Sequence, residues 1–149
     1  SLDVVILGAT EIDTNFNVNV HTDSNGYIMG GSGGHSDTAA GAKMSMIVAP
    51  LSRARLPIVV DEVLCKSTPG HTVDVLVTQR GIAVNPLRQD LTEKFKGAGL
   101  PVFDICELRD MAVKLNGKPK MLTRGQKEVA KVIYRDGTLL DTIYSVPVR

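Results

Sequence analysis

The chain has few of the residues that characterise several large functional classes. It contains no tryptophan and only 4% aromatic residues, which argues against a protein that binds bases by stacking them on aromatic rings. Its formal net charge is +1, and Lys and Arg are spread along the chain without the basic stripe of a nucleic-acid surface. No apolar run approaches the length of a membrane-spanning helix. We therefore expect no nucleic-acid or membrane partner and a cytoplasmic location.

Cysteine and metal-binding patterns are scarce as well. Cys65 and Cys106 are the only two cysteines, and they lie far apart without metal-binding spacing, so we expect two reduced thiols. The three histidines, His21, His35 and His71, show neither an HExxH motif nor a paired spacing. No metal is expected on this chain.

The chain does have enough apolar sequence to fold. With 149 residues, 43% of them hydrophobic, it suits a single domain with an ordinary core. It begins at Ser1 rather than Met and enters the apolar run DVVILGA almost at once. We therefore expect a piece of a longer protein.

The apolar periodicity predicts an α/β fold. Strands are predicted over residues 3–9, 15–21, 27–29, 44–51, 56–64 and 72–84, the last with a break at Arg80–Gly81. Helices are predicted over residues 38–43, 85–100 and 104–117. Asn25–Gly26 and Asp136–Gly137 are hairpin turn signals, and Asp104 with Glu107 has the spacing of a capping box. The predicted architecture is one mostly parallel open sheet with β-hairpins and short helices.

The most unusual stretch is GGSGGHSD, residues 30–37. It lacks the Gly-Lys-Ser/Thr of a P-loop, and Ser36 occupies the third glycine position of a dinucleotide fingerprint. Backbone N–H groups of such a turn can form a concavity for a phosphate, a carboxylate or a developing oxyanion. A tight strand-to-helix turn without a ligand is equally compatible. Ser36 or Asp37 is expected to cap the helix that follows.

Glu11 follows the first predicted strand, where strand ends meet ligands in open α/β sheets. A carboxylate there suits a nucleophile or a general base, although a solvated strand-end residue is the commoner case. Asn15, Asn17 and Asn19 form a polar row on the next strand. Asparagine is uncommon in strands, so this row is either a wet edge or a face that hydrogen-bonds a ligand.

Four further side chains are candidates for ligand contact. His35 adjoins the glycines, whereas His21 and His71 are expected at the surface. Arg53, Arg55 and Arg80 are candidates for binding an anionic substrate, with a solvated loop as the alternative.

Three motifs occur in the order found in one family of enzymes. Ala9–Asp13, Gly31–Asp37 and Val73–Ala83 resemble the Ala-x-Glu-[Ile/Val]-Asp, Gly-x-Gly-Gly-x-x-Asp and Val-Asp-x-x-Val-Thr-x-x-Gly-[Ile/Val]-Ala segments of acyl-CoA transferases. These are transferases of the acetyl-CoA hydrolase/4-hydroxybutyrate CoA-transferase type. The GGSGGHSDTAAGAK form and the following IVAPLSRARLPIVVDEV resemble the C-terminal part of citrate lyase alpha chains.

The resemblance implies a CoA-transferase-like fold. Residues 1–149 would form a single domain, the C-terminal half of a two-domain alpha chain with the thioester site between its halves. The implied enzyme is a citrate CoA-transferase that needs the other half. It exchanges acetyl for citryl on the thioester of a CoA-like phosphoribosyl-dephospho-CoA group, which an acyl carrier protein bears. No permanently bound cofactor is implied, and the implied partners are the beta (lyase) and gamma (acyl carrier) chains, with citrate and an acetyl thioester as substrates.

The resemblance also implies roles for individual residues. Glu11, Gly33 and Gly34 fall at the catalytic centre, where the glycine N–H groups would stabilise charge on the thioester carbonyl. The candidate substrate-binding or CoA-binding residues are Gly31, Ser32, His35, Asp37, Asn17 and Asn19. The matching glutamate is the nucleophile in relatives that form an enzyme thioester. The citrate lyase branch is similar but is expected to transfer the acyl carrier directly through an acetyl–citryl anhydride, so that nucleophile, base and orienting group all stay open as roles for Glu11.

Two alternatives remain open from the sequence. One is a different short-chain acyl-CoA transferase or hydrolase, which a substrate panel distinguishes. The other is a non-catalytic piece that acts as a binding or assembly domain, because half a cleft cannot position two substrates.

Overall fold

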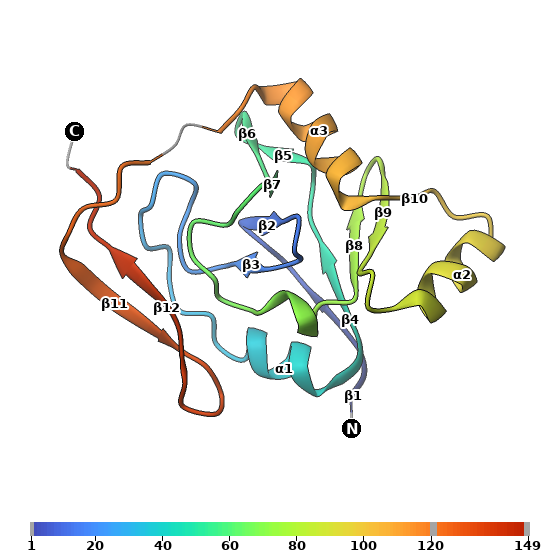
Figure 1. Cartoon of the computed structure of the whole chain (residues 1–149), viewed down its shortest axis with the longest axis horizontal. Coiled ribbons are helices and arrows are strands. Elements are labelled where there is room, and N and C mark those ends of the chain that lie inside the picture. The colour runs from blue at the N-terminus through green and yellow to red at the C-terminus, as the bar shows by residue number, and fades with distance from the viewer. Residues whose placement is uncertain (1, 120–121, 148–149) are drawn as a thin grey trace.

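The computed structural model describes residues 2–119 and 122–147 and shows a mixed α/β organisation (Figure 1). The strands are β1 (Leu2–Leu7), β2 (Glu11–Asp13), β3 (Val18–Asn19), β4 (Ala42–Val48), β5 (Ser52–Arg53), β6 (Leu56–Pro57), β7 (Val59–Val60), β8 (Val75–Thr78), β9 (Gly81–Val84), β10 (Val102–Phe103), β11 (Glu128–Ile133) and β12 (Leu139–Tyr144). The helices are α1 (His35–Gly41), α2 (Gln89–Gly97) and α3 (Ile105–Asn116), with a 3-10 turn at Gly70–Thr72.

The main sheet has five strands in the order β1-β4-β8-β9-β10. The pairs β1–β4, β4–β8 and β9–β10 are parallel, whereas β8 and β9 form an antiparallel hairpin at the predicted Arg80–Gly81 break. The prediction of a mostly parallel sheet with hairpins is confirmed.

A smaller sheet, β3-β2-β7, lies against one face of the main sheet. Ile12 of β2, Ile47 of β4, Leu76 of β8 and Leu108 of α3 are fully buried in the shared core. The C-terminal hairpin β11–β12 packs separately, with Val132 and Ile143 around Cys65. β2, the strand that begins with Glu11, therefore lies between β3 and β7 in a small sheet that packs against the main sheet.

The first strand is in a different position from the one expected. Its apolar run predicted a buried strand, but β1 is an edge strand in which Leu2, Val4 and Ile6 are 43%, 45% and 66% exposed. α2 packs near the opposite edge, beside β10 (Figure 1). A continuous apolar run predicts a strand, but it does not say what covers each face.

The asparagine row is also different from the expected strand. Of residues 15–21 only Val18 and Asn19 form a strand, because Phe16 has a left-handed φ of 63° that turns the chain. Asn19 is fully buried and Asn17 half-buried, whereas Asn15 is exposed, so the prediction of a wet edge is wrong for Asn19 and holds for Asn15. Likewise, the predicted return strand at 27–29 is reduced to a single bridge between Thr22 and Ile28.

The helix predictions hold to different degrees. Asp104 and Glu107 form the predicted capping box at the start of α3. α1 starts three residues before its predicted position, after Gly34, and no side chain caps it. The prediction that Ser36 or Asp37 is its cap is therefore wrong, because both already lie inside the first turn.

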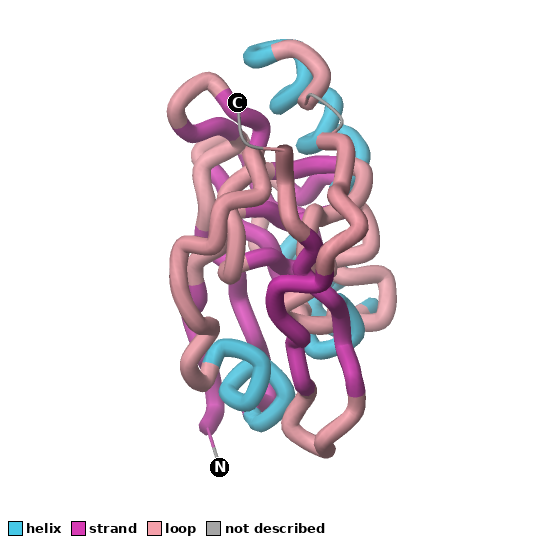
Figure 2. The backbone as a smooth tube through the Cα atoms, turned by 90° about the vertical axis from the view of Figure 1, so that its left-hand side faces the viewer, coloured by secondary structure: helices cyan, strands magenta, loops and turns pink. Residues whose placement is uncertain are grey.

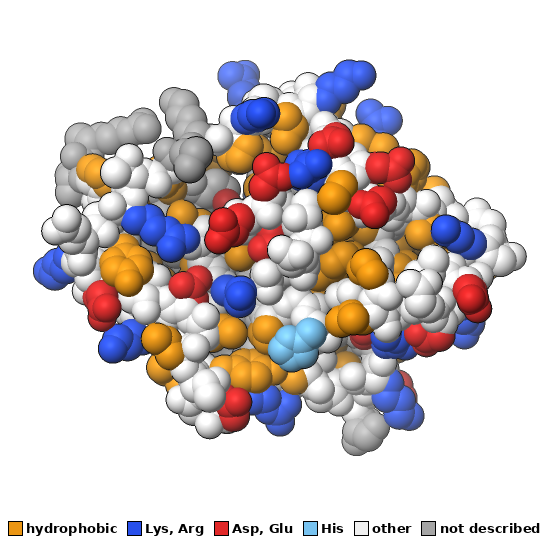
Figure 3. Space-filling model, viewed as in Figure 1, with side chains coloured by type: hydrophobic (Ala, Val, Ile, Leu, Met, Phe, Trp, Pro, Cys, Tyr) orange, Lys and Arg blue, Asp and Glu red, His pale blue; other side chains and the backbone are white. Residues whose placement is uncertain are grey.

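The surface is mixed in charge. On the face shown in Figure 3, the coloured Lys and Arg side chains are interspersed with Asp and Glu. Figure 2 shows that a neighbouring side of the molecule consists mostly of loops, with strands of a hairpin toward the viewer. Within residues 2–119 and 122–147, no helix has the length and apolar character needed to cross a membrane.

At Gly70 the chain after β7 passes close to the backbone of the turn between β2 and β3. A Cβ there would overlap the carbonyl oxygen of Asn15 and lie 2.9 Å from the backbone nitrogen of Asn17. Both obstacles are backbone atoms, so they cannot move aside without disturbing the turn that leads into β3.

We predict that Gly70→Ala lowers the free energy of unfolding by about 3 kcal/mol, because the added methyl group displaces backbone. The control is Gly97→Ala at the end of α2, where a Cβ meets nothing within 4 Å. This change should leave stability unchanged or raise it by up to about 1 kcal/mol. Urea denaturation measures both, and equal effects would contradict the packing described for Gly70.

Candidate active site

Glu11 is 5% exposed and is therefore not a solvated strand-end residue. Its Oε2 accepts hydrogen bonds from Nδ2 of Asn19 and from the backbone N–H of Leu64, both at 3.0 Å. Among the described residues, none donates to Oε1, and no buried side-chain oxygen lacks a partner. Glu11 also lines the larger groove described below. One oxygen of this carboxylate is therefore anchored, and the other receives no hydrogen bond from the described residues.

Asn19 pairs with Glu11 across β2 and β3 and orients it. Its Nδ2 also donates to Oγ1 of Thr22 (2.8 Å), and its Oδ1 accepts the backbone N–H groups of His21 and Thr22 (both 3.1 Å). The amide thus bonds four internal groups while holding Glu11 in place. A direct contact between Asn19 and a ligand stays a prediction.

Asp13, two residues after Glu11 in β2, forms a second carboxylate–amide pair with Asn17. Oδ1 of Asp13 accepts the N–H groups of Asn15 (2.9 Å) and Asn17 (3.0 Å), and its Oδ2 accepts Nδ2 of Asn17 (3.1 Å). Oδ1 of Asn17 accepts the N–H of Gly70 (2.9 Å). The side chain of Asn17 therefore links Asp13 to Gly70 and stabilises the turn. Contact between Asn17 and a ligand stays a prediction.

The glycine loop is open on its outer side. Gly30, Gly31 and Gly33 are exposed, and a Cβ built on any of the three would meet nothing within 4 Å. Only Gly33 has a left-handed φ, of 54°, which favours glycine for conformational reasons. At Gly30 and Gly31 neither strain nor packing within the described chain requires glycine.

The residues after these glycines complete the loop. Ser32 is half-buried, and its carbonyl accepts the N–H of His35 (3.1 Å). Gly34 is the residue before α1, and its carbonyl accepts the N–H of Thr38 (2.9 Å). Asp37 is exposed in the first turn of α1.

His35 joins the glycine loop to the strand that leads to Glu11. Its Nε2 lies 2.9 Å from the carbonyl oxygen of Gly8, and its Nδ1 lies 2.8 Å from Oγ1 of Thr68. A carbonyl only accepts, so Nε2 carries the proton and Nδ1 accepts from the Thr68 hydroxyl. Within the described residues, no hydrogen bond joins the loop to Glu11 directly. The connection runs through Gly8, three residues before Glu11.

A groove of about 920 Å³ has Glu11 in its wall. The other walls come from the segment after β7, from α3 and from the chain beyond α3. Nη2 of Arg124 donates to the carbonyl of Leu64 (2.8 Å), the residue whose N–H anchors Glu11. Arg109 also lines this groove, but it is paired with Asp61 and Asp110. Neither the Leu64 N–H nor Arg124 was identified from sequence, because a backbone donor has no sequence signal and Arg124 lies outside the motifs.

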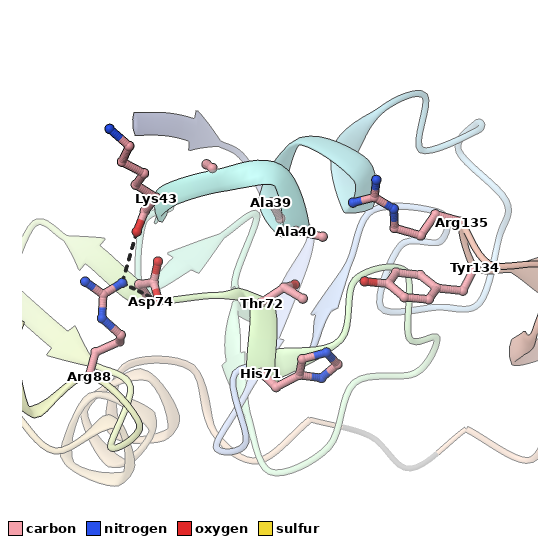
Figure 4. Close-up of a pocket in the computed structure, with 10 residues that line it drawn as sticks. Ala39, Ala40, Lys43, His71, Thr72, Asp74, Arg88, Tyr134 and Arg135 are labelled. Carbon is pink, nitrogen blue, oxygen red and sulfur yellow. Dashed lines mark hydrogen bonds and ion pairs between the residues drawn. The ribbon is translucent and has the colours of Figure 1, made fainter. Parts of the chain in front are cut away.

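A smaller groove of about 450 Å³ lies beside α1 (Figure 4). Arg88 spans one end, with Nη1 at 3.0 Å from Oδ1 of Asp74 and 3.2 Å from the carbonyl of Lys43. Tyr134 and Arg135 of the C-terminal hairpin line the other end. None of the sequence-predicted site residues lines this groove, so the larger one is the candidate active site.

The remaining candidates lie elsewhere. Arg53 and Arg55 belong to the β5–β6 hairpin and Arg80 to the turn between β8 and β9, and none of them lines either groove. Cys65 is buried, and burial raises the pKa of its thiol to about 12. Cys106 is exposed. In the described part of the chain, no group of three His, Cys, Asp or Glu residues is placed to hold a metal ion.

The fold and the site together define the class of this protein. It is an α/β protein with an anchored carboxylate and an open glycine loop. A family model described as citrate lyase, alpha subunit (CitF), matches residues 1–146. The chain belongs to the citrate lyase alpha subunit family.

Two curated relatives and one solved structure illustrate the similarity. The chain is 55% identical to the citrate lyase alpha chain of Klebsiella pneumoniae and 54% identical to that of Haemophilus influenzae, each over 145 residues. These matches cover 97% of this chain but 28% and 29% of the relatives. A Streptococcus mutans protein assigned as the alfa subunit of citrate lyase, solved in complex with citrate, matches with 50% identity and a TM-score of 0.96. This match covers 99% of this chain and 29% of that one. The chain thus spans less than a third of the length of these relatives.

The two histidines near the glycine loop predict a pH dependence of stability. Burial lowers the pKa of His35 and of His21 below the ordinary 6.5, and for His21 the neighbouring His35 adds to the effect. The folded chain then binds fewer protons than the unfolded chain just below pH 6.5, so stability falls as the pH drops from about 6.5 toward the lowered folded-state pKa values.

We expect His35→Gln to make the fall in Tm between pH 7 and pH 5 shallower, because one of the two groups no longer titrates. The control is His71→Gln, which changes an exposed histidine and should preserve the wild-type slope. Thermal unfolding followed by circular dichroism over this pH range measures both. An unchanged slope in His35→Gln would contradict the assignment.

Proposed function

We propose that these residues form part of the citrate CoA-transferase subunit of citrate lyase. In this proposal the whole alpha subunit exchanges acetyl for citryl on the thioester of a CoA-like phosphoribosyl-dephospho-CoA group. The carrier is an acyl carrier protein, and a separate beta chain acts on the citryl thioester. Membership of the citrate lyase alpha subunit family supports the proposal, as does the Streptococcus mutans relative solved in complex with citrate.

The observation that carries the proposal is the half-anchored carboxylate of Glu11. Two N–H groups fix Oε2, whereas no described residue donates to Oε1, and Glu11 lies in the wall of the large groove. The only hydrogen-bond donor of fully ionised citrate is its hydroxyl group. A fixed carboxylate oxygen can therefore orient citrate through that hydroxyl without first moving.

The reaction balances without a covalent intermediate on the enzyme. A citrate carboxylate attacks the acetyl carbonyl of the thioester. The C–S bond breaks, the thiolate is expelled, and an acetyl–citryl anhydride forms. The thiolate then attacks the citryl carbonyl of the anhydride and acetate leaves, giving a citryl thioester. In this route Glu11 orients citrate and is not itself acylated.

None of residues 30–37 lines the large groove, and in the proposal the glycine loop supplies the complementary part of the site from outside it. In each addition step negative charge develops on a carbonyl oxygen, and backbone N–H groups aimed at that oxygen stabilise it. In the proposal, Gly31, Gly33 and Gly34 provide such groups, with Ser32, His35 and Asp37 beside them. The open space over Gly31 and Gly33 is compatible with the close approach of a thioester.

We predict that Glu11→Gln in the whole alpha subunit slows acetyl–citryl exchange by about 100-fold or more, because the amide cannot accept the same hydrogen bonds on both sides. With citrate labelled by oxygen-18 in its carboxylates, the acetate of the first turnover should carry label. Attack by Glu11 would instead place an unlabelled Glu11 oxygen in that acetate. Mass spectrometry of a single turnover measures both the rate and the label.

The control is Glu93→Gln on the exposed surface of α2, which should exchange at the wild-type rate. Undiminished exchange in Glu11→Gln would remove Glu11 from the site. Unlabelled acetate in the wild-type reaction would replace the direct route by an acylated Glu11.

The glycine loop allows a test that separates function from folding. A Cβ at Gly31 meets nothing within 4 Å, so Gly31→Ala should leave Tm unchanged. If a thioester must approach that backbone, the same change should lower exchange by about tenfold or more. Gly97→Ala, also with open space at its Cβ, serves as the matched control for activity. Full activity in Gly31→Ala would leave the loop as a turn alone.

A further inference from the structure

One of the two faces of the main sheet is covered by other elements over only half of its area. Side chains alternate along a strand, so Leu2, Val4 and Ile6 of β1 point to the face opposite Leu7, which packs on the core. The register pairs Val4 with Met44 and Ile6 with Met46. These residues form one continuous apolar surface, here called the open sheet face, which consists of Leu2, Val4, Ile6, Met44, Met46 and Val48.

The open sheet face is exposed because α2, the helix on this side of the sheet, covers the strands far from β1. α2 packs Leu91 and Phe95 over Val75 and Val84, at the far half of the same face. Toward β1 the exposure rises, and Ile6 is 66% and Val48 47% exposed. A contiguous apolar surface of this kind is uncommon on a free protein and marks an interface.

The opposite face shows what a complete cover looks like. There Ile47 and Leu76 are fully buried under α3 and the β2-containing layer. In α/β folds the faces of the sheet are covered by helices, because a sheet buries its apolar faces against another layer. The missing cover should therefore be helical and continue the layer that α2 begins.

The lengths of the relatives favour a cover from the same polypeptide. The matched 145 residues are 28% of the Klebsiella pneumoniae alpha chain, so most of such a subunit is further chain tethered to this domain. Tethering raises the effective concentration of an intrachain partner far above that of a second molecule. A second copy paired through the free edge of β1 would extend the sheet but leave this face as open as before.

We propose that the open sheet face is covered, in the whole alpha subunit, by an amphipathic helix from the part of the alpha chain outside residues 1–149. This contact lies on the face of the sheet away from the Glu11 layer. It joins the domain to the rest of its own chain independently of the reaction proposed above.

Site-specific photocrosslinking in the whole alpha subunit tests the proposal. With p-benzoylphenylalanine in place of Ile6, irradiation should link Ile6 to a peptide of the same polypeptide outside residues 1–149. The control position is Leu87, which is 70% exposed in the turn before α2 and should crosslink about tenfold less. Crosslinks to a second alpha chain or to another subunit would overturn the proposal, as would an Ile6 yield as low as that of Leu87.

Stability provides an independent readout. Ile6→Asp should lower the Tm of the whole alpha subunit by about 5 °C or more, because it buries a charge against the covering helix, whereas Leu87→Asp should change it little. Should Ile6→Asp fail to fold, the smaller change Ile6→Thr is compared with Leu87→Thr. Equal shifts at the two positions would show that Ile6 is exposed in the subunit and would contradict the proposal.

Discussion

The burial of one carboxylate is the constraint around which this domain is arranged. Glu11 lies almost out of water, and a carboxylate in that position needs hydrogen-bond donors. Asn19 supplies one because β3 pairs antiparallel with β2, and Leu64 supplies another because the chain beyond β7 returns over the same edge. The small sheet, the turn before β3 and the loop after β7 thus hold one side chain in a fixed direction. The same arrangement leaves its second oxygen without a donor among the described residues.

The sequence alone predicts the elements whose causes are local. The capping box at Asp104 and Glu107 and the turn at Asp136–Gly137 depend on residues a few positions apart, and both occur where expected. The mostly parallel sheet follows from apolar strands separated by helices. The assignment of Glu11 and the glycine loop to the site stays a prediction, made from a strand-end position, a glycine cluster and three ordered motifs.

The remaining features depend on contacts between distant residues, which periodicity cannot contain. The sequence of the asparagine row is compatible with a solvated edge. Only the structure shows that Asn17 and Asn19 donate hydrogen bonds to Asp13 and Glu11. The start of α1 without a side-chain cap becomes intelligible only when His35 is seen to bond Gly8 and Thr68. Leu64 donates to Glu11 through its backbone N–H. Any residue except proline could do the same, so the sequence carries no signal for this contact.

The cysteine beside this site has a consequence for selectivity between nucleophiles. Cys65 is buried one residue after Leu64, and Glu11 is among the acidic groups that raise the pKa of its thiol, to about 12. A thiol with that pKa is almost entirely protonated at neutral pH, and the protonated form is a poor acceptor of acyl groups. If the thioester exchange proposed above takes place, the sulfur of Cys65 would then compete little with the sulfur of the proposed carrier for acyl groups.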